Sequence, residues 1–413
     1  MSLAHPISPS SDGSLDELIT ARQFIVDPYP TYRILRESAP VYYSPAWRVW
    51  ILSRYDDIVR VLRDPKRFSN AGRFSGLIDR LPADVGGEMT ALRHHYSAGL
   101  IQSDPPDHTR LRTLVRDAFS ASTLQRLRPR IQSIIDELIE VFRQSGRFNV
   151  VRDFAYPLPV IVISELLGVP AEHRDRFLIW SHDITGLQAT GGANADCARR
   201  ANRAIQEVED YFREICAERR RNRQDDLISY MIAAQDSGDK LSDDELINMC
   251  VTFLLAGHET TKNLIANAIL TLISYPEQLA ALRENPSIFP SAIEEFLRYE
   301  SPIQRGWRRV AEDVELNGRQ VAAGELVFLM FGSANRDPAQ FPEPDRLDLR
   351  RINNRHIAFG YGVHFCIGAP LARLEAPLAL GTLLNRLPAL RLEHLEWHES
   401  VHVRGPSRLE VTF

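Results

Sequence analysis

Apolar residues recur at helical spacing through the long middle of the chain, and short apolar runs lie nearer its ends. The helical spacing predicts helices over 107–119, 121–145, 198–222 and 242–275. Strand-like segments stand at 49–53, 314–316, 327–331 and 409–413. Gly, Pro, Asn and Asp make three stretches loop-rich, namely 70–103, 186–196 and 332–365. The pattern predicts a mainly α fold with small β-sheets.

No linker separates two self-sufficient halves, so we expect one domain over 18–413 after a flexible N-terminal arm over 1–17. The arm is polar and lacks the basic start and apolar middle of a secretory signal. No apolar run reaches the roughly 18 residues that a membrane helix needs. These features favour a cytoplasmic protein that contacts no membrane.

The charge balance excludes some partners. Lys and Arg number 49 against 54 Asp and Glu, a net charge of -5, so there is no overall basic surface for nucleic acid. Only three of the cations are lysines (Lys66, Lys240 and Lys262), and the rest are arginines. Codon usage in a GC-rich genome explains this excess. Arginine also suits bidentate contacts to carboxylates, so such sites are a second interpretation.

Four cysteines stand apart, with no CxxC pair, which argues against a zinc module or a disulfide framework. Cys366 is distinctive because it follows a Gly-rich loop and precedes a predicted helix over 370–387. A helix N-terminus lowers the pKa of a thiol, and Gly362 and Gly368 let backbone approach the sulfur closely. Taken alone, Cys366 is a metal ligand, a nucleophile or a buried structural thiol.

The whole loop resembles the heme-binding loop of the cytochrome P-450 family, F-x-x-G-x-H-x-C-x-G. All its fixed positions are filled, by Phe359, Gly362, His364, Cys366 and Gly368. The resemblance implies that Cys366 is the thiolate ligand of a heme b iron, with His364 on a propionate and Phe359, Gly360 and Gly368 against the cofactor. It also implies the cytochrome P-450 fold, with the heme buried between a long central helix and the cysteine loop.

The segment 256–261 is unusual for the centre of the apolar helix predicted over 242–275. It contains a glycine, which weakens a helix, and a carboxylate, which is costly to bury; such conflicts occur at functional sites. Without further evidence, a kink with a solvated Glu259 explains it equally well. The segment resembles the family motif A-G-x-(D/E)-T-T. Glu259 would then relay protons inward and Thr260 would direct them to the oxygen bound on iron, while Ala256 and Gly257 leave room for dioxygen and substrate. His258 is expected to pack or join a polar network.

Further charged residues match family positions. His108 and Arg112 stand one turn apart in a segment that resembles the helix carrying propionate ligands. Arg308 fits another propionate contact, with the adjacent Arg309 as its competitor.

The E-x-x-R spacing of Glu295 and Arg298 puts both residues on one helix face, where an exposed ion pair is the ordinary interpretation. The resemblance implies instead that they brace the cysteine loop together with Arg346, in a structural role.

The resemblance runs from residues 27–30 to 404–406. It implies a monooxygenase that inserts one oxygen atom of O₂, the co-substrate, into an apolar small molecule. Electrons would come from a ferredoxin or similar donor with its reductase, and NAD(P)H would act only through those partners. A basic patch would suit an acidic donor, with candidates Arg110, Arg116, Arg350, Arg351 and Arg355. A peroxide-driven peroxygenase and a non-catalytic heme-binding module are the alternatives.

The substrate itself is not determined by the sequence. By family position, substrate contacts are expected at Thr252, Leu255, Ala256, Gln304, Arg305 and Gly306. Loops over 70–103 and 186–196 should complete the pocket, with Phe74, Leu77 and Leu100 as apolar lining. Polyketides, terpenoids, steroids and fatty acids all stay open.

Overall fold

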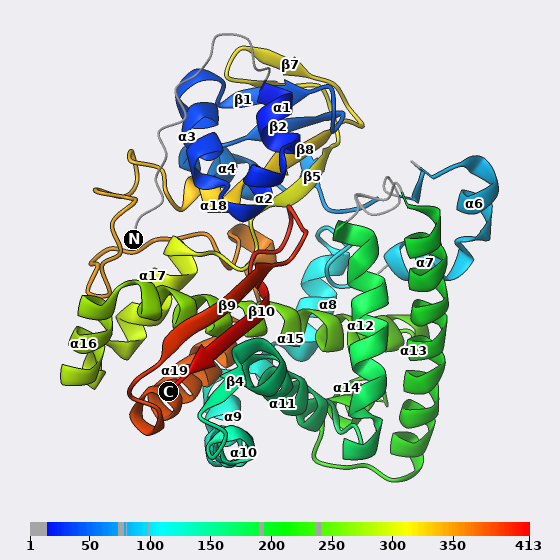
Figure 1. Cartoon of the computed structure of the whole chain (residues 1–413). Coiled ribbons are helices and arrows are strands. Elements are labelled where there is room, and N and C mark those ends of the chain that lie inside the picture. The colour runs from blue at the N-terminus through cyan, green and yellow to red at the C-terminus, as the bar shows by residue number, and fades with distance from the viewer. Residues whose placement is uncertain (1–14, 73–77, 80, 98, 190–193, 237–240) are drawn as a thin grey trace.

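A computed structural model describes residues 15–413 except 73–77, 80, 98, 190–193 and 237–240. The described chain is mainly helical with small sheets, which confirms the predicted fold class (Figure 1). The predicted arm over 1–17 lies outside the described residues except for its last three positions, which begin the first helix.

The helices differ widely in length. Their bounds are α1 Leu15–Thr20, α2 Arg22–Val26, α3 Tyr29–Ser38, α4 Tyr55–Leu62, α6 Ala83–Glu88, α7 Thr90–Ser97, α8 Asp107–Arg116, α9 Ala121–Gln125, α10 Arg128–Phe142, α11 Pro157–Leu167, α12 Arg174–Ala189, α13 Ala195–Arg221, α14 Leu227–Asp236, α15 Asp243–Ser274, α16 Pro276–Glu284, α17 Phe289–Tyr299, α18 Phe331–Ala334 and α19 Ala369–Arg386. Single helical turns stand at Asp117–Phe119, Val150–Ala155, Ala171–His173, Pro286–Ile288 and Gly362–His364.

Two predictions about the helices are wrong. The continuous helix expected over 121–145 is two helices, because Pro129 cannot donate to the Gln125 carbonyl and its ring clashes there; α9 ends at Gln125. The loop expected over 70–103 contains α6 and α7. Gly86 and Gly87 conceal α6 in the pattern, and the buried Leu92 anchors α7.

The strands form three small sheets. Their bounds are β1 Val41–Ser44, β2 Val49–Leu52, β3 Phe68–Ser69, β4 Arg147–Asn149, β5 Gly306–Val310, β6 Val314–Leu316, β7 Arg319–Val321, β8 Leu326–Leu329, β9 Arg391–Trp397 and β10 Pro406–Thr412. The largest sheet has the order β1-β2-β8-β5-β3, with β2 and β8 parallel and the other neighbours antiparallel. Strands β4, β10 and β9 form the second sheet, and β6 pairs with β7.

Helix α15 is the central element (Figure 1). It begins at a capping box, in which Ser242 and Glu245 satisfy each other's backbone N–H groups, and it runs for 32 residues. Its N-terminal half packs into one apolar cluster with α13 and α14, and its C-terminal half into a second with α10, α17 and α19. Burial on both sides explains why the α15 sequence is apolar over most of its surface.

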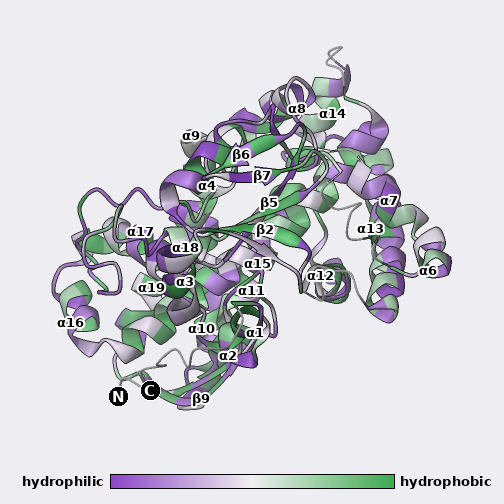
Figure 2. Cartoon of the chain, turned by 90° about the horizontal axis from the view of Figure 1, so that it is seen from above, coloured by the Kyte–Doolittle hydropathy of each residue, from purple (hydrophilic) through white to green (hydrophobic). Residues whose placement is uncertain are grey.

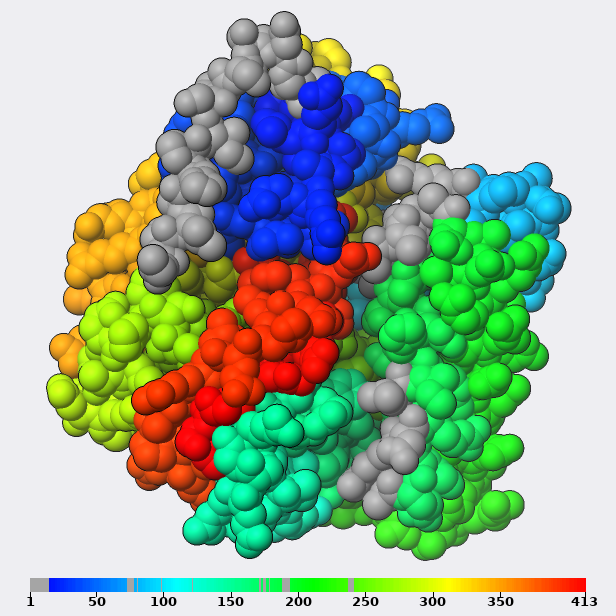
Figure 3. All heavy atoms as spheres, in the orientation of Figure 1, coloured from blue at the N-terminus to red at the C-terminus, as the bar shows by residue number. Residues whose placement is uncertain are grey.

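A third apolar cluster lies on the five-stranded sheet, with residues of β2, β5 and β8, and apolar residues colour β2 in Figure 2. In the space-filling view, the N-terminal segment with α1–α4, the C-terminal strands and α12–α13 form separate regions of one face (Figure 3). The described part of the chain holds no helix with the length and apolar character that a membrane span requires.

Candidate functional site

One cavity of about 420 Å³ brings the middle of α15 and the cysteine loop together. That volume suits a small-molecule or cofactor site. Most residues predicted for the site line it, namely His108, Arg112, Thr252, Leu255, Ala256, Gly257, Glu259, Thr260, Arg305, Gly306, Arg308, Phe359, Gly360, His364, Cys366 and Gly368.

The Cys366 side chain is exposed to this cavity although the cavity lies inside the protein. Its backbone N–H donates to the Phe359 carbonyl at 2.9 Å, which closes the loop just before α19. Burial raises the pKa of Cys366 and outweighs the lowering by the N–H groups of Gly368 and Ala369 and by the Arg112 guanidinium. The expected lowering of the thiol pKa is therefore wrong in its net direction. Such a thiol becomes a thiolate when it coordinates a metal ion.

The two loop glycines predicted to approach the sulfur lie in different surroundings. Gly362 has φ +71°, and a Cβ there would lie 2.5 Å from the Leu62 carbonyl oxygen, so α4 requires the glycine. At Gly368 a Cβ would lie 3.8 Å from Cys366 Sγ, which is ordinary van der Waals contact. The backbone N–H of Gly368 does bond to the sulfur, as predicted, whereas the nearest contact at Gly362 is with α4.

The centre of α15 opens onto the cavity at Ala256, which is exposed in the middle of a buried helix. A Cβ on Gly257 would meet Ile163 of α11 at 2.8 Å, so helix packing also requires this glycine. The Thr260 hydroxyl donates to the Ala256 carbonyl at 3.2 Å, the bond expected for a threonine within a helix. His258 packs as expected. It is fully buried, and its Nε2 lies 2.8 Å from Ser181 Oγ.

Glu259 is held from outside the cavity by the Lys262 ammonium, which donates to its Oε1 at 2.5 Å. Burial raises the pKa of Glu259, but Lys262 chiefly, together with His258 and His398, outweighs that effect and holds the pKa below its usual value. Glu259 is therefore an ionised carboxylate at neutral pH rather than a solvated charge at a kink. Lys262 was not among the predicted site residues, although a lysine is rarely found in a buried apolar helix and could have been noticed for that reason.

A cationic region lies at one part of the cavity wall. Neither ring nitrogen of the buried His108 has a hydrogen-bond partner among the described residues. Burial first, then the Arg112 charge, lowers the pKa of His108. Arg112 lines the same part of the cavity, and the ring of His364 lies 4.0 Å from the His108 ring between centroids, tilted by 51°. Orphaned donors beside cations fit the carboxylates of a heme.

The structure separates the two neighbouring arginines of β5. Arg308 is buried and lines the cavity, while Arg309 is exposed. Burial lowers the pKa of Arg308 to about 10, against an opposite effect of Asp104. Its guanidinium donates to the Trp307 carbonyl at 2.8 Å. Of the two candidates, only Arg308 stands where a propionate could reach it.

One predicted substrate contact is wrong. Gln304 does not line the cavity, because its amide is used inside the protein. It accepts from the Tyr32 hydroxyl at 3.0 Å and donates to the Ser301 carbonyl at 2.8 Å. Arg305 does line the cavity, and its guanidinium lies 4.3 Å from the Phe328 ring centroid. Phe74 and Leu77 lie outside the described residues, whereas Leu100 lines the wall.

The stretch over 70–103 lines the pocket as predicted, and it contributes the polar residues Asn70, His95 and Gln102, none of which was singled out individually. His95 Nδ1 lies 3.1 Å from Glu209 Oε1 on α13, a residue far along the chain. Their local sequence carries no motif, so only the tertiary contacts reveal them.

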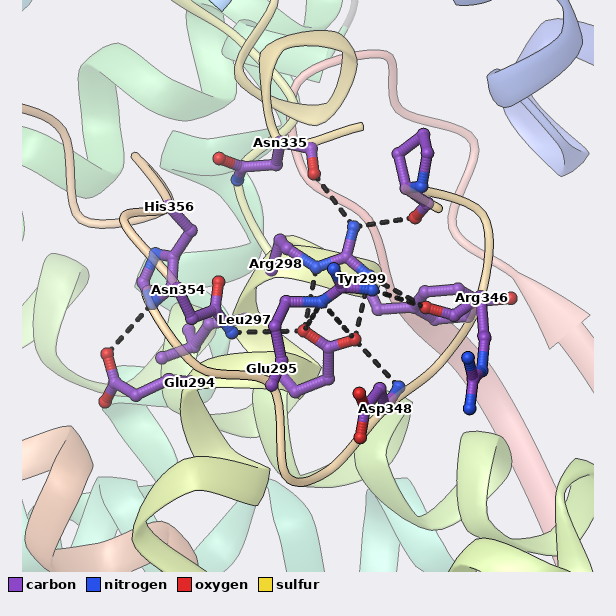
Figure 4. A network of polar contacts seen from close by, with 12 residues as sticks. Glu294, Glu295, Leu297, Arg298, Tyr299, Asn335, Arg346, Asp348, Asn354 and His356 are labelled. Carbon is purple, nitrogen blue, oxygen red and sulfur yellow. Dashed lines mark hydrogen bonds and ion pairs between the residues drawn. The ribbon is translucent and has the colours of Figure 1, made fainter. Parts of the chain in front are cut away.

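The Glu295–Arg298 pair is fully buried and bidentate, at 2.7 and 2.8 Å (Figure 4). The predicted third partner is wrong. The Arg346 side chain is exposed and pairs with Glu343, and only its carbonyl accepts from Arg298, at 3.2 Å. Arg351 supplies the second guanidinium, 3.2 Å from both Glu295 oxygens.

This network organises the segment before the cysteine loop. Arg298 also donates to the carbonyls of Asn335 and Pro344, and Glu295 accepts from the Asp348 N–H and from the Asn354 amide. Because Arg351 is tied up here, it does not belong to the predicted basic surface patch. Arg110 is also engaged, with Glu245 at 2.6 Å.

Comparisons with known proteins find a matching family model and similar sequences and structures. The model of the family described as "Cytochrome P450" matches residues 41–389. The chain is 43% identical over 371 residues to "Cytochrome P450 107B1" of Saccharopolyspora erythraea, covering 88% of each. It is 41% identical over 397 residues to "Vitamin D(3) 25-hydroxylase" of Pseudonocardia autotrophica, covering 94% of each. The crystal structure of myxobacterial cytochrome P450 CYP267B1 with myristic acid superposes with a TM-score of 0.87 at 40% identity, covering 96% of this chain and 98% of that one.

Proposed function

Because the chain belongs to the cytochrome P450 family, it is a heme-thiolate monooxygenase of small molecules, and we propose that Cys366 is the thiolate ligand. When bound, the heme activates dioxygen, so that one oxygen atom enters the substrate and the other is reduced to water. The observation that carries the proposal is that Cys366, Glu259 and Thr260 open onto one cavity.

The cationic wall would hold the cofactor. The propionates would be held by four side chains of this wall, namely His108, Arg112, Arg308 and His364. Hydrogen bonds from these side chains would replace the bonds to water that the carboxylates lose on burial. Phe359 would shield the sulfur side, since its ring lines the cavity below the Arg373 guanidinium, 4.7 Å from the ring centroid. Ala256 and Gly257 would face the cofactor from α15.

Glu259 and Thr260 would move protons into the cavity. The ionised Glu259 carboxylate takes up a proton and passes it inward, and the Thr260 hydroxyl receives and directs it. The Thr260 hydroxyl donates to the Ala256 carbonyl at 3.2 Å. The lone pairs of its oxygen can accept a further hydrogen bond. This acid and hydroxyl also favour O₂-dependent turnover over a peroxide-driven reaction, which needs no proton relay.

Bacterial members of the family receive electrons from redox partners. We propose a ferredoxin or similar protein with its reductase as those partners, with NAD(P)H acting only through them. The substrate would be an apolar small molecule in contact with Thr252, Leu255, Ala256, Arg305 and Gly306. The cytoplasmic location stays a prediction.

Thr260→Ala tests the proton path. Vitamin D₃ and myristic acid serve as probes, because a relative is named for the first and a solved relative binds the second. With ferredoxin, reductase and NADPH, we expect severalfold less hydroxylated product per NADPH and correspondingly more hydrogen peroxide. Thr271→Ala is the matched control, since Thr271 lies on the same helix away from the cavity. Unchanged coupling in Thr260→Ala would remove this residue from the mechanism.

A further inference from the structure

A lysine outside the cavity wall holds the carboxylate of Glu259, and a histidine contacts that lysine. Lys262 lies three positions further along α15, and its ammonium donates to Glu259 Oε1. The same ammonium lies 3.1 Å from His398 Nε2. His398 directly follows β9, so an element from the C-terminal sheet fixes the outer end of the ion pair. Neither Lys262 nor His398 lines the cavity.

Burial makes this contact strong. The Lys262 side chain is 5% exposed and that of Glu259 is 17% exposed. An ion pair with so little water around it is screened less than a surface pair. Lys262 is also one of only three lysines in an arginine-rich chain, and it stands in a helix most of whose described residues are buried. A compact ammonium with three donors can bond to Glu259 and His398 at once.

The cluster extends from the cavity wall to the half-buried His398. Thr260 and Glu259 line the cavity, Lys262 bonds to Glu259 from outside the wall, and the half-buried His398 contacts the Lys262 ammonium. The other titratable group next to Glu259 is His258 on α15, and His182 of α12 faces His398. The His182 side chain is 83% exposed, so the row of groups runs from the wall of the cavity toward solvent.

We propose that Lys262 and His398 are positioning residues for proton delivery, which hold Glu259 as an ionised, oriented carboxylate between the cavity and the protein surface. This inference rests on the proton role of Glu259 in the proposed function. The Lys262 charge makes Glu259 a stronger acid, so a proton taken up there is released again rather than retained. His398 accepts from Lys262 and thereby keeps the ammonium on Glu259.

The protonation states fit this arrangement. Burial, and after it the Lys262 charge, lowers the pKa of His398 to about 4. The ring is therefore neutral from about pH 5 upward, with the proton on Nδ1 and Nε2 available as acceptor. Because the His398 ring is neutral, the charge of the Lys262 ammonium is balanced by the Glu259 carboxylate.

Infrared spectroscopy of the heme-loaded protein tests the role of Lys262 without turnover. The carbonyl stretch of a protonated Glu259, assigned by its loss in Glu259→Gln, is followed from pH 5 to pH 8. We expect no such band in the unchanged protein and a band in Lys262→Met, because removal of the cation should raise proton affinity about 10- to 1000-fold. Lys262→Arg should restore the ionised state.

Lys66→Met is the matched control, since it makes the same chemical change at an exposed lysine, and it should leave the spectrum unchanged. His398→Ala is a second, independent variant and should produce a smaller shift in the same direction. If Glu259 stays ionised in both Lys262→Met and His398→Ala, the proposal is overturned. Full coupling in Thr260→Ala would instead contradict the proposed function, so the two failures are distinguishable.

Discussion

Arg308 and Arg309 are neighbours in sequence but occupy opposite environments. Successive side chains of a strand point to opposite faces, and in β5 this turns Arg308 into the cavity and Arg309 to solvent. The low pKa of Arg308, about 10, reflects how completely burial removes its water. A carboxylate bound there would restore the lost interactions, which is why Arg308 suits a propionate and Arg309 does not.

Arg308→Gln should weaken heme binding about 10- to 100-fold, because a hydrogen bond to a charged group contributes about 1.5–3 kcal/mol. Heme transfer to apomyoglobin, followed in the visible spectrum, measures the change. Arg309→Gln carries the same substitution on the exposed face of β5 and should match the unchanged protein. Equal heme loss from both variants would show that Arg308 makes no propionate contact.

At the scale of an element, α19 combines the cysteine loop at its start with a buried acid in its second turn. Glu375 is 1% exposed, and among the described residues neither of its carboxylate oxygens has a hydrogen-bond partner. Burial alone raises its pKa to about 8, so the group is neutral at pH 7. An acid without partners in an apolar core is tolerated only while it stays protonated.

Glu375 should therefore make stability fall as pH rises. The folded state binds more protons than the unfolded state between the ordinary pKa of 4.5 and about 8, so the free energy of unfolding drops across that window. The slope is about 1.4 kcal/mol per pH unit, and the loss is complete above about pH 8. Melting temperatures at pH 5.5 and pH 8.5 measure it. Glu375→Gln should gain several degrees relative to the unchanged protein at the higher pH, and a constant difference would contradict this account.

Across the whole molecule, the network around Glu295 joins α17 to the segment that leads to the cysteine loop. Glu295 and Arg298 are both fully buried, and their bonds reach residues from 335 to 354. A carboxylate at 0% exposure requires several donors, and Arg298 and Arg351 provide most of them. The long loop before Cys366 is thereby held by its partners rather than by secondary structure of its own.

Arg351→Met should destabilise the fold by about 1–3 kcal/mol, since it removes hydrogen bonds from a buried carboxylate. Arg346→Met should change stability by less than about 1 kcal/mol, because the Arg346 side chain is exposed and only its carbonyl joins the network. Urea unfolding followed by helical circular dichroism measures both. The reverse order would restore Arg346 as the third partner.

The local sequence determined the site's main components. The cysteine loop, the Glu259–Thr260 pair and the apolar spacing of α15 could be predicted because each depends on residues within a few positions of one another. The helix break at Pro129 was also encoded locally, since proline lacks the N–H that α9 would need to continue. The continuous helix predicted over 121–145 did not take this proline into account.

Only the tertiary structure decided which distant groups meet. Lys262 and His398 are 136 positions apart, and Glu295 and Arg351 are 56 apart. Gln304 is withdrawn from the cavity by Tyr32, and Arg351 rather than Arg346 reaches Glu295. Hydrogen bonds and ion pairs act over a few ångströms in space, and that distance is set by how the elements pack rather than by separation along the chain.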